Sequence, residues 1–383
     1  MDREAPGYPL YFGGLRKLGV FPYDYQDLTM TTKVLTTGKK FYHLNILTAF
    51  LIVSKQLYLI LLSLSTFTNE GPHPDMMFRV MWFLGSLFLT SMFLVHILFP
   101  TEVARFISSY IRIENSILAS TSLWTSKDHK KKFKVFLCGY FGMWVGGQVF
   151  MGALYIWNPA FFPFIYSELE YFLIEGSWTL RKLLFGTVGL FEMNFMGLAM
   201  ANMAGFDILI GFASLSIQAC LVELEKVGKE KLNPGNNNVF RYYKMLEILT
   251  KLMNEAFSTV LLGHFWVVFM MLPFFIYGLE HYAVSAATTL FFFWCCLFQV
   301  VRVATIWIPM AFVQKQSWIT LRNLRSLHFT GTNNNNSNSA LFKRQLKSCQ
   351  PLAFSSGGLY SISVESILKY IYFSTTFIVI FVG

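Results

Sequence analysis

GLYSISVESILKYIYFSTTFIVIFVG, residues 358–383, ends the chain and holds only two charged side chains, Glu365 and Lys369. At about 1.5 Å of rise per residue, a helix of roughly 26 residues spans about 39 Å, which is enough to cross a bilayer. We therefore predict a final membrane helix over this stretch.

Serine and threonine side chains interrupt the apolar residues of this helix, so one side of it needs a neighbouring helix or water. Four residues spaced by three or four share one narrow face. They are Phe373, Thr376, Ile380 and Gly383. The residues alone leave two interpretations open: a stripe that packs against another helix, or the wall of a pore.

The composition is that of a membrane protein with several spans. Of the 383 residues, 54% are hydrophobic, 18% aromatic and only 14% charged. The mean hydropathy is +0.47. One soluble core does not hide so much apolar surface, so we expect an all-α membrane protein in contact with lipid. The net charge of +10 comes without a basic cluster interleaved with aromatics in a soluble domain, so we expect no nucleic-acid partner.

Seven hydrophobic runs predict seven transmembrane helices. They lie at about 41–65, 76–99, 133–157, 184–213, 256–279, 284–312 and 358–382. Lys and Arg concentrate in the N-terminal segment and in the connections after the second, fourth and sixth runs. Because positively charged loops stay in the cytosol, we expect a cytosolic N-terminus and an extracellular C-terminus, the reverse of a G-protein-coupled receptor.

Two spans continue as helical patterns beyond the membrane, through residues 207–230 and from 241–255. Tyr243, Leu246, Leu249 and Met253 line one face of the second pattern. Apolar faces that project from a membrane need partners, so we expect a cytosolic anchor bundle. The expected division is a cytosolic segment (1–40), six spans with cytosolic helix extensions (41–313), a cytosolic anchor segment with an Asn-rich loop (314–357) and the last helix (358–383).

Catalytic and metal-binding signals are weak. The sequence has no phosphate-binding loop, nucleophile elbow or HExxH motif, and its histidines have no carboxylate or cysteine at ligand spacing. We therefore expect no enzyme, no cofactor and no metal site. Asp207 and Arg302 fall within or beside apolar runs, where a charge is a functional candidate. An interhelical pair, or a position near the cytosolic headgroups, is the interpretation that we favour for both.

Aromatic residues gather near the predicted outer ends of the spans. The candidate residues are Phe78, Trp82, Trp144, Gln148, Met151, Tyr155, Phe191, Phe195, Tyr282, Thr289 and Phe292. The four from Trp144 to Tyr155 are spaced by four, three and four residues, which makes one helix face with a single amide. Converging, these side chains would enclose an apolar cavity for a small, weakly polar ligand. The alternative is ordinary bundle core or an interfacial aromatic belt.

The layout of seven spans, the stretch GFDILIGFASLSIQACLVEL and the ending SISVESILKYIYFSTTFIVIFVG resemble the insect odorant receptor family. The most specific part is the Ser-x-Glu opening at Ser363 and Glu365, followed by a hydroxyl-bearing helix and an apolar stop. The Thr-Tyr…Gln-Phe signature of the related gustatory receptors is absent from this sequence.

The resemblance implies an odorant-gated, non-selective cation channel in the plasma membrane of olfactory sensory neurons. In that family four subunits line a pore with their last helices, and odorant-tuning chains form heterotetramers with a shared co-receptor. By this resemblance Ile380 stands at the hydrophobic gate. Gly383 replaces the filter Gln of the co-receptor, which fits a tuning subunit that borrows selectivity from its partners. The alternative is a metabotropic seven-helix chemoreceptor of the G-protein-coupled type.

Overall fold

The computed structural model describes residues 24–26, 29–31, 36–65, 74–120, 127–157, 178–230, 238–281, 285–327 and 344–382. Its helices are α2 (Thr36–Ser65), α3 (Pro74–Leu98), α4 (Pro100–Ser120), α5 (Lys127–Trp157), α7 (Trp178–Glu230), α8 (Asn238–His281), α9 (Ala286–Arg302), the π-helix η2 (Val303–Trp307), α10 (Ile308–Leu327) and α12 (Val364–Val382). Two antiparallel strand pairs complete it, β1 (Asp24–Gln26) with β2 (Thr29–Thr31) and β3 (Ser355–Ser356) with β4 (Tyr360–Ser361).

The all-α fold class is confirmed, since each of the seven predicted spans coincides with a helix over most of its length. Judged by length and hydropathy over the described residues, two segments are able to cross a membrane by themselves, Met200–Lys226 and Ala286–Ser326. The bent pair Phe83–Leu98 and Pro100–Ile113 adds a third.

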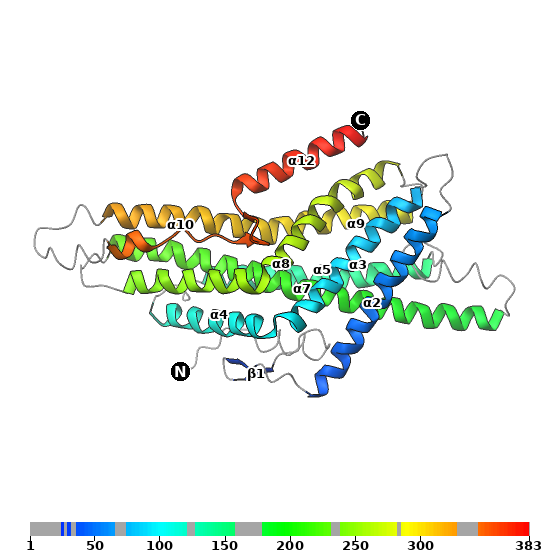
Figure 1. Cartoon of the computed structure of the whole chain (residues 1–383), viewed down its shortest axis with the longest axis horizontal. Coiled ribbons are helices and arrows are strands. Elements are labelled where there is room, and N and C mark those ends of the chain that lie inside the picture. The colour runs from blue at the N-terminus through cyan, green and yellow to red at the C-terminus, as the bar shows by residue number, and fades with distance from the viewer. Residues whose placement is uncertain are drawn as a thin grey trace, which may run out of the picture.

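The helical patterns predicted for residues 207–230 and 241–255 are confirmed. α7 runs unbroken for 53 residues and α8 for 44, and both reach the end of the molecule where α4 and α10 lie (Figure 1). In that bundle α10 packs mainly against α7, and α4 packs against α8. The predicted apolar face of α8 is buried there. Its members, Tyr243, Leu246, Leu249 and Met253, are at most 2% exposed. Burial also raises the pKa of the Tyr243 phenol.

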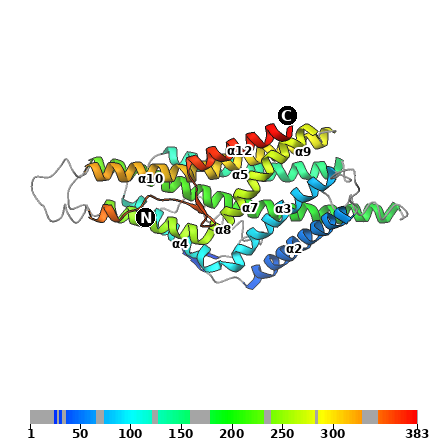
Figure 2. The same cartoon turned by 45° about the horizontal axis from the view of Figure 1, so that its top comes forward.

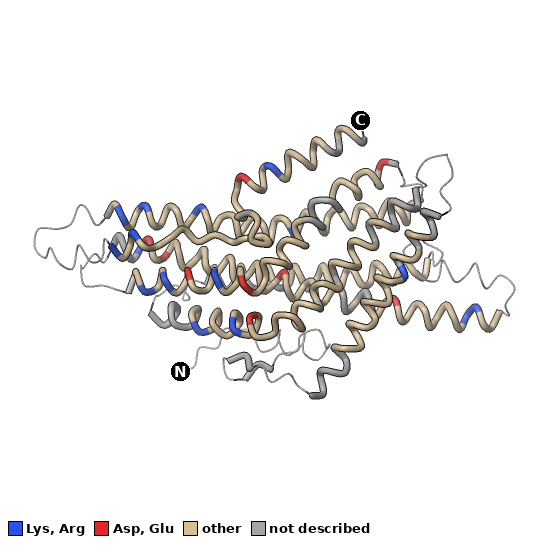
Figure 3. The backbone as a smooth tube through the Cα atoms, in the orientation of Figure 1, with Lys and Arg blue, Asp and Glu red and all other residues tan. Residues whose placement is uncertain are grey.

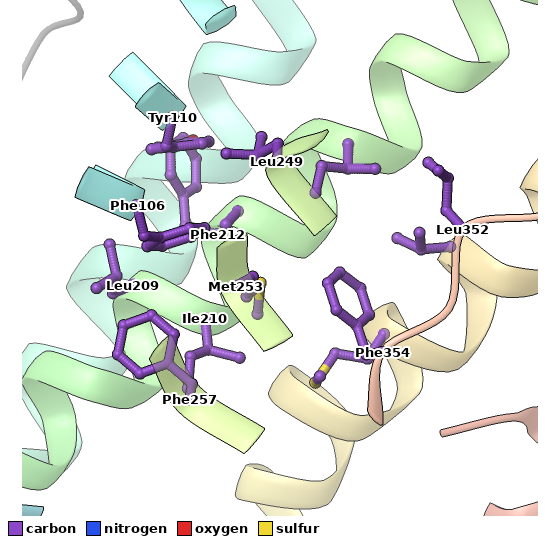
Figure 4. Close-up of a cluster of buried hydrophobic side chains, with 14 of the residues drawn as sticks. Phe106, Tyr110, Leu209, Ile210, Phe212, Leu249, Met253, Phe257, Leu352 and Phe354 are labelled. Carbon is purple, nitrogen blue, oxygen red and sulfur yellow. The ribbon is translucent and has the colours of Figure 1, made fainter. Parts of the chain in front are cut away.

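Aromatic rings join the helices of this bundle (Figure 4). The ring of Phe106 on α4 meets that of Phe257 on α8 edge-on, with centroids 5.2 Å apart. Tyr110 on α4 meets Phe212 on α7 in the same way at 6.3 Å. Phe354, in the segment before β3, is fully buried. The segment that precedes α12 is therefore part of this core, and α12 starts from a fixed base.

Helix α4 was not predicted, because residues 100–120 were assigned to a connection. Pro100 opens α4, and the helix axis turns by 83° between Phe83–Leu98 and Pro100–Ile113. Proline has no amide hydrogen to continue the preceding helix but fits the first turn of a new one. The missed signal is the spacing of Val103, Ile107 and Tyr110, which are all buried on one face.

The last helix begins later than the sequence pattern indicates. The prediction of helix from residue 358 is wrong, since α12 starts at Val364. Gly357 and Gly358 have φ of 60° and 70°, a left-handed conformation that turns the chain between β3 and β4. The Ser363 hydroxyl then accepts a hydrogen bond from the Ser366 amide at 3.1 Å, which caps the new helix. At about 1.5 Å per residue, α12 is about 29 Å long, close to the hydrocarbon thickness of a bilayer.

The boundary expected at 313/314 also falls inside a helix. Residues 286–327 form one continuous helical run through α9, η2 and α10. The sixth predicted span and the start of the anchor segment are thus a single rod. The N-terminal boundary at residue 40 lies inside α2. The Asn-rich stretch lies outside the described residues.

Charge separates along the molecule (Figure 3). Most of the described Lys and Arg lie at the end where α4, α10, the end of α7 and the start of α8 meet. The start of α7, which carries Arg181 and Lys182, lies at the opposite end of the molecule (Figure 1). This distribution matches the predicted sidedness, and the orientation in a membrane stays a prediction.

Candidate functional site

The predicted stripe on α5 faces α7. The Trp144 indole Nε1 donates to the Gly197 carbonyl at 3.2 Å. One turn further along α5, the Gln148 Oε1 lies 3.4 Å from the position that a Cβ on Gly197 would take. The Tyr155 hydroxyl donates to the Phe185 carbonyl at 2.8 Å, and the two rings stack at 5.0 Å. The stripe is therefore one seam between two helices.

One end of this seam belongs to a hydrophobic cluster, called here the ligand cluster. Its buried members are Met151, Leu154, Tyr155, Ala287, Phe291 and Phe292, from α5 and α9. Residues of α7 and α8 pack around them. A Cβ on Gly189 would overlap the Tyr155 ring, and one on Gly278 would overlap the Phe292 ring. Gly189 and Gly278 thus leave room for the two aromatic rings, because any larger residue at either position would collide with the ring beside it.

About one turn of α5 before Met151, a polar side chain lies in the same seam between α5 and α7. The Gln148 Nε2 is buried and has no hydrogen-bond partner among the described residues. The Trp144 indole and the Tyr155 hydroxyl already donate to backbone carbonyls. An unpaired buried amide is costly, and a hydrogen-bond acceptor beside it would remove that cost.

Other predicted ligand residues lie elsewhere or outside the description. Phe191 is 39% exposed on α7. Thr289 is exposed, and its hydroxyl donates to the Ser285 carbonyl at 3.0 Å in the first turn of α9. The side chains of Phe78, Trp82 and Phe195, and all of Tyr282, lie outside the described residues. Of the predicted set, the structure brings Met151, Tyr155 and Phe292 together in the ligand cluster. Trp144 packs against the main hydrophobic core, and both Trp144 and Gln148 face Gly197 of α7.

The predicted pore residues lie on α12, the helix that leaves the rest of the bundle at an angle (Figures 1 and 2). Phe373 is 47% and Ile380 69% exposed. The Thr376 hydroxyl donates to the Tyr372 carbonyl at 2.9 Å, so it is satisfied within the helix. Gly383 lies outside the described residues. Among the described residues of the stripe, Ile380 thus presents the most exposed apolar side chain.

The two charges singled out in the sequence form an interhelical pair, as predicted. The Arg302 Nε donates to the Asp207 Oδ2 at 2.8 Å, and both side chains are 1% exposed. Within the described ranges, no group of three or more His, Cys, Asp or Glu side chains has a metal-binding arrangement. The chemistry of the described sites is therefore packing, hydrogen bonding and one neutralised charge pair.

Comparison of the fold with solved structures gives a clear result. Insect olfactory receptor OR5 from Machilis hrabei superimposes with a TM-score of 0.70 and 11% identity, over 97% of this chain and 96% of that one. The chain has the insect olfactory receptor fold. The structure of the same receptor in complex with eugenol gives a TM-score of 0.70 and 10% identity over the same shares. No family model and no curated protein matches the sequence.

The olfactory receptor fold accounts for features that periodicity alone left open. The superposition covers 97% of this chain, and α4, α7, α8 and α12 are elements of the fold that it compares. The solved structures with this fold are olfactory receptors. This agrees with the sequence, in which we found no enzymatic motif.

Proposed function

We propose that the chain is an odorant-receptor subunit of a ligand-gated, non-selective cation channel. It belongs in the plasma membrane of olfactory sensory neurons, with a cytosolic N-terminus. Four subunits, including a shared co-receptor, line the pore with α12. The observation that carries this proposal is the fold match over 97% of the chain with a solved olfactory receptor.

The exposed face of α12 supports the pore. An exposed apolar helix face in a membrane protein has lipid, another subunit or a dewetted channel as its partner. Ile380 is the most exposed of the described residues predicted to line the pore. A ring of such side chains closes a pore by excluding water, so Ile380 is suited to act as a gate. Gly383 has no side-chain amide for an ion, which favours a subunit that relies on its partners for selectivity.

The ligand cluster supports recognition of a small volatile. Aromatic and aliphatic side chains, with the Gln148 amide about one helical turn away on α5, suit a weakly polar, aromatic odorant. A ligand of about ten heavy atoms at roughly 0.6–0.8 kcal/mol per atom binds at about micromolar strength. Such a ligand opens the channel only by binding the open state more tightly than the closed one.

The test is whole-cell recording of the chain expressed with and without the co-receptor, during an odorant panel and with G-protein signalling blocked. We expect odorant-evoked cation current that persists under the block and requires the co-receptor. Responses abolished by the block would favour the metabotropic alternative. The matched control is the co-receptor alone, which should lack responses to the same odorants.

A further inference from the structure

Four buried side chains form a polar network between helices, called here the buried network: Asp207, His264, Arg302 and Trp307. Arg302 donates twice to Asp207, from Nε to Oδ2 at 2.8 Å and from a terminal nitrogen to Oδ1 at 3.2 Å. The Trp307 Nε1 donates to the His264 Nδ1 at 3.1 Å. The His264 Nε2 lies 3.5 Å from the Asp207 Oδ1. The contacts thus run from α9 through α7 and α8 to η2.

The charges of the network balance internally. Because the His264 Nδ1 accepts a hydrogen bond, the imidazole is neutral and carries its proton on Nε2, towards Asp207. The Arg302 guanidinium therefore neutralises the only carboxylate in the network. It also lies 5.7 Å from the Phe88 ring and 5.6 Å from the Phe298 ring, within cation–π range. Because its charges are neutralised and its members are bonded to one another, the network holds these four side chains in place within apolar surroundings.

The far end of the network reaches the base of α12. Trp307 forms one wall of a hollow lined by Phe265, Val303, Trp307, Ser366, Ile367 and Tyr370. The Phe265 ring lies between the two sides, with its centroid 5.2 Å from Trp307 and 6.4 Å from Tyr370. The indole fixed by His264 is thus one aromatic ring away from the first two turns of α12.

The segment that carries Trp307 is itself irregular. η2 is a five-residue π-helix, a form that occurs mostly as short insertions and often at functional sites. It is held tightly, since a Cβ on Gly211 of α7 would lie 2.8 Å from the Thr305 carbonyl oxygen. The Thr305 hydroxyl also forms a 2.6 Å hydrogen bond with the Tyr140 hydroxyl of α5. The contacts with α5 and α7 therefore fix the backbone of the π-helix that carries Trp307.

We infer that Trp307 is a positioning residue for the pore helix: its bond to His264 transmits the position of the buried network to the base of α12. This inference rests on the proposed channel function and adds a role that lies outside the ligand cluster. Loss of one buried hydrogen bond changes an equilibrium by about twofold to thirteenfold. A bond that is made in only one of the two states biases the balance between resting and open channels, so its removal should change that balance by this factor.

The test uses the full chain with the co-receptor and compares the ratio of resting to maximal odorant current. Trp307→Phe removes the donor, and His264→Leu removes the acceptor. His264→Asn keeps an acceptor near the position of Nδ1. Each of the first two variants should change the ratio by about twofold to thirteenfold, the double variant should match either single one, and His264→Asn should resemble the wild type. The odorant rank order should stay unchanged in all four.

The matched control is Trp318→Phe, a change of the same kind at a 58% exposed position of α10, which should leave the ratio unchanged. Additive effects in the double variant, or no effect of Trp307→Phe, would overturn the inference. A change in rank order would do so as well, because the network would then act on ligand binding.

A second measurement is independent of current. Amide hydrogen exchange of the purified chain should become faster at residues 364–370 in Trp307→Phe and His264→Leu, and stay as in the wild type in His264→Asn. If the wild type gives no odorant current, the proposed function fails, and this exchange pattern still decides whether Trp307 holds the base of α12. Unchanged exchange at 364–370 in both variants would refute the coupling.

Discussion

Replacing Gln148 with Leu separates the hydrogen bond of the proposed ligand site from its packing. The two side chains have similar volumes, so the seam between α5 and α7 stays filled. The buried Nε2 that has no partner among the described residues disappears. A neutral hydrogen bond contributes about 0.5–1.5 kcal/mol, so agonists that accept this bond should lose about twofold to thirteenfold in potency.

The assay is the odorant concentration for half-maximal current, with agonists compared in matched pairs. Each pair shares a carbon skeleton, and one member bears a carbonyl or hydroxyl group where the other is a hydrocarbon. The hydrocarbon should keep its potency or gain, since an unpaired buried donor costs about 1–3 kcal/mol and the variant no longer carries it. Surface expression should stay at the wild-type level, because the variant loses an unpaired buried donor and keeps a side chain of similar volume.

Two results would refute this reasoning about Gln148. Equal losses for both members of a pair would mean that the side chain supports the fold rather than the ligand. No loss for either member would place the hydrogen bond, or the whole ligand cavity, elsewhere in the chain.

Three further changes test the gate, the anchor bundle and the ligand cluster. Ile380→Ser should wet the constriction and raise ligand-free current, and unchanged resting current at normal surface expression would exclude the gate. Leu246→Ser with Leu249→Ser should abolish surface tetramers, because each lost Leu costs about 2–5 kcal/mol, and native gel assembly at wild-type levels would contradict this. Met151→Ala or Tyr155→Ala should weaken the best odorants by about tenfold and reorder the panel, while an agonist of the co-receptor keeps its response.

Helices were predictable from the sequence where one pattern dominates. Each of the seven apolar runs coincides with a helix over most of its length, and the face from Tyr243 to Met253 was correctly predicted to be buried. Boundaries were less predictable where two patterns merge. Residues 286–327 change from membrane-like to polar composition without a break in the helix, so composition suggested a boundary that the backbone does not have.

The buried network could be predicted only in part. Asp207 and Arg302 stood out because charges are rare in apolar runs, and their pairing followed from the need for neutralisation. His264 offered no comparable signal, since its partners lie 43 and 57 positions away in sequence at Trp307 and Asp207. Contacts of that kind depend on how α7, α8 and η2 pack against one another. Helix periodicity within each segment does not predict that packing.

The most direct test of the central claim is single-channel recording in planar lipid bilayers that contain only this chain and the co-receptor. The account predicts cation currents that open on addition of an odorant, with no G protein or nucleotide present. Absence of unitary currents, from bilayers in which the same preparation binds the odorant, would contradict it.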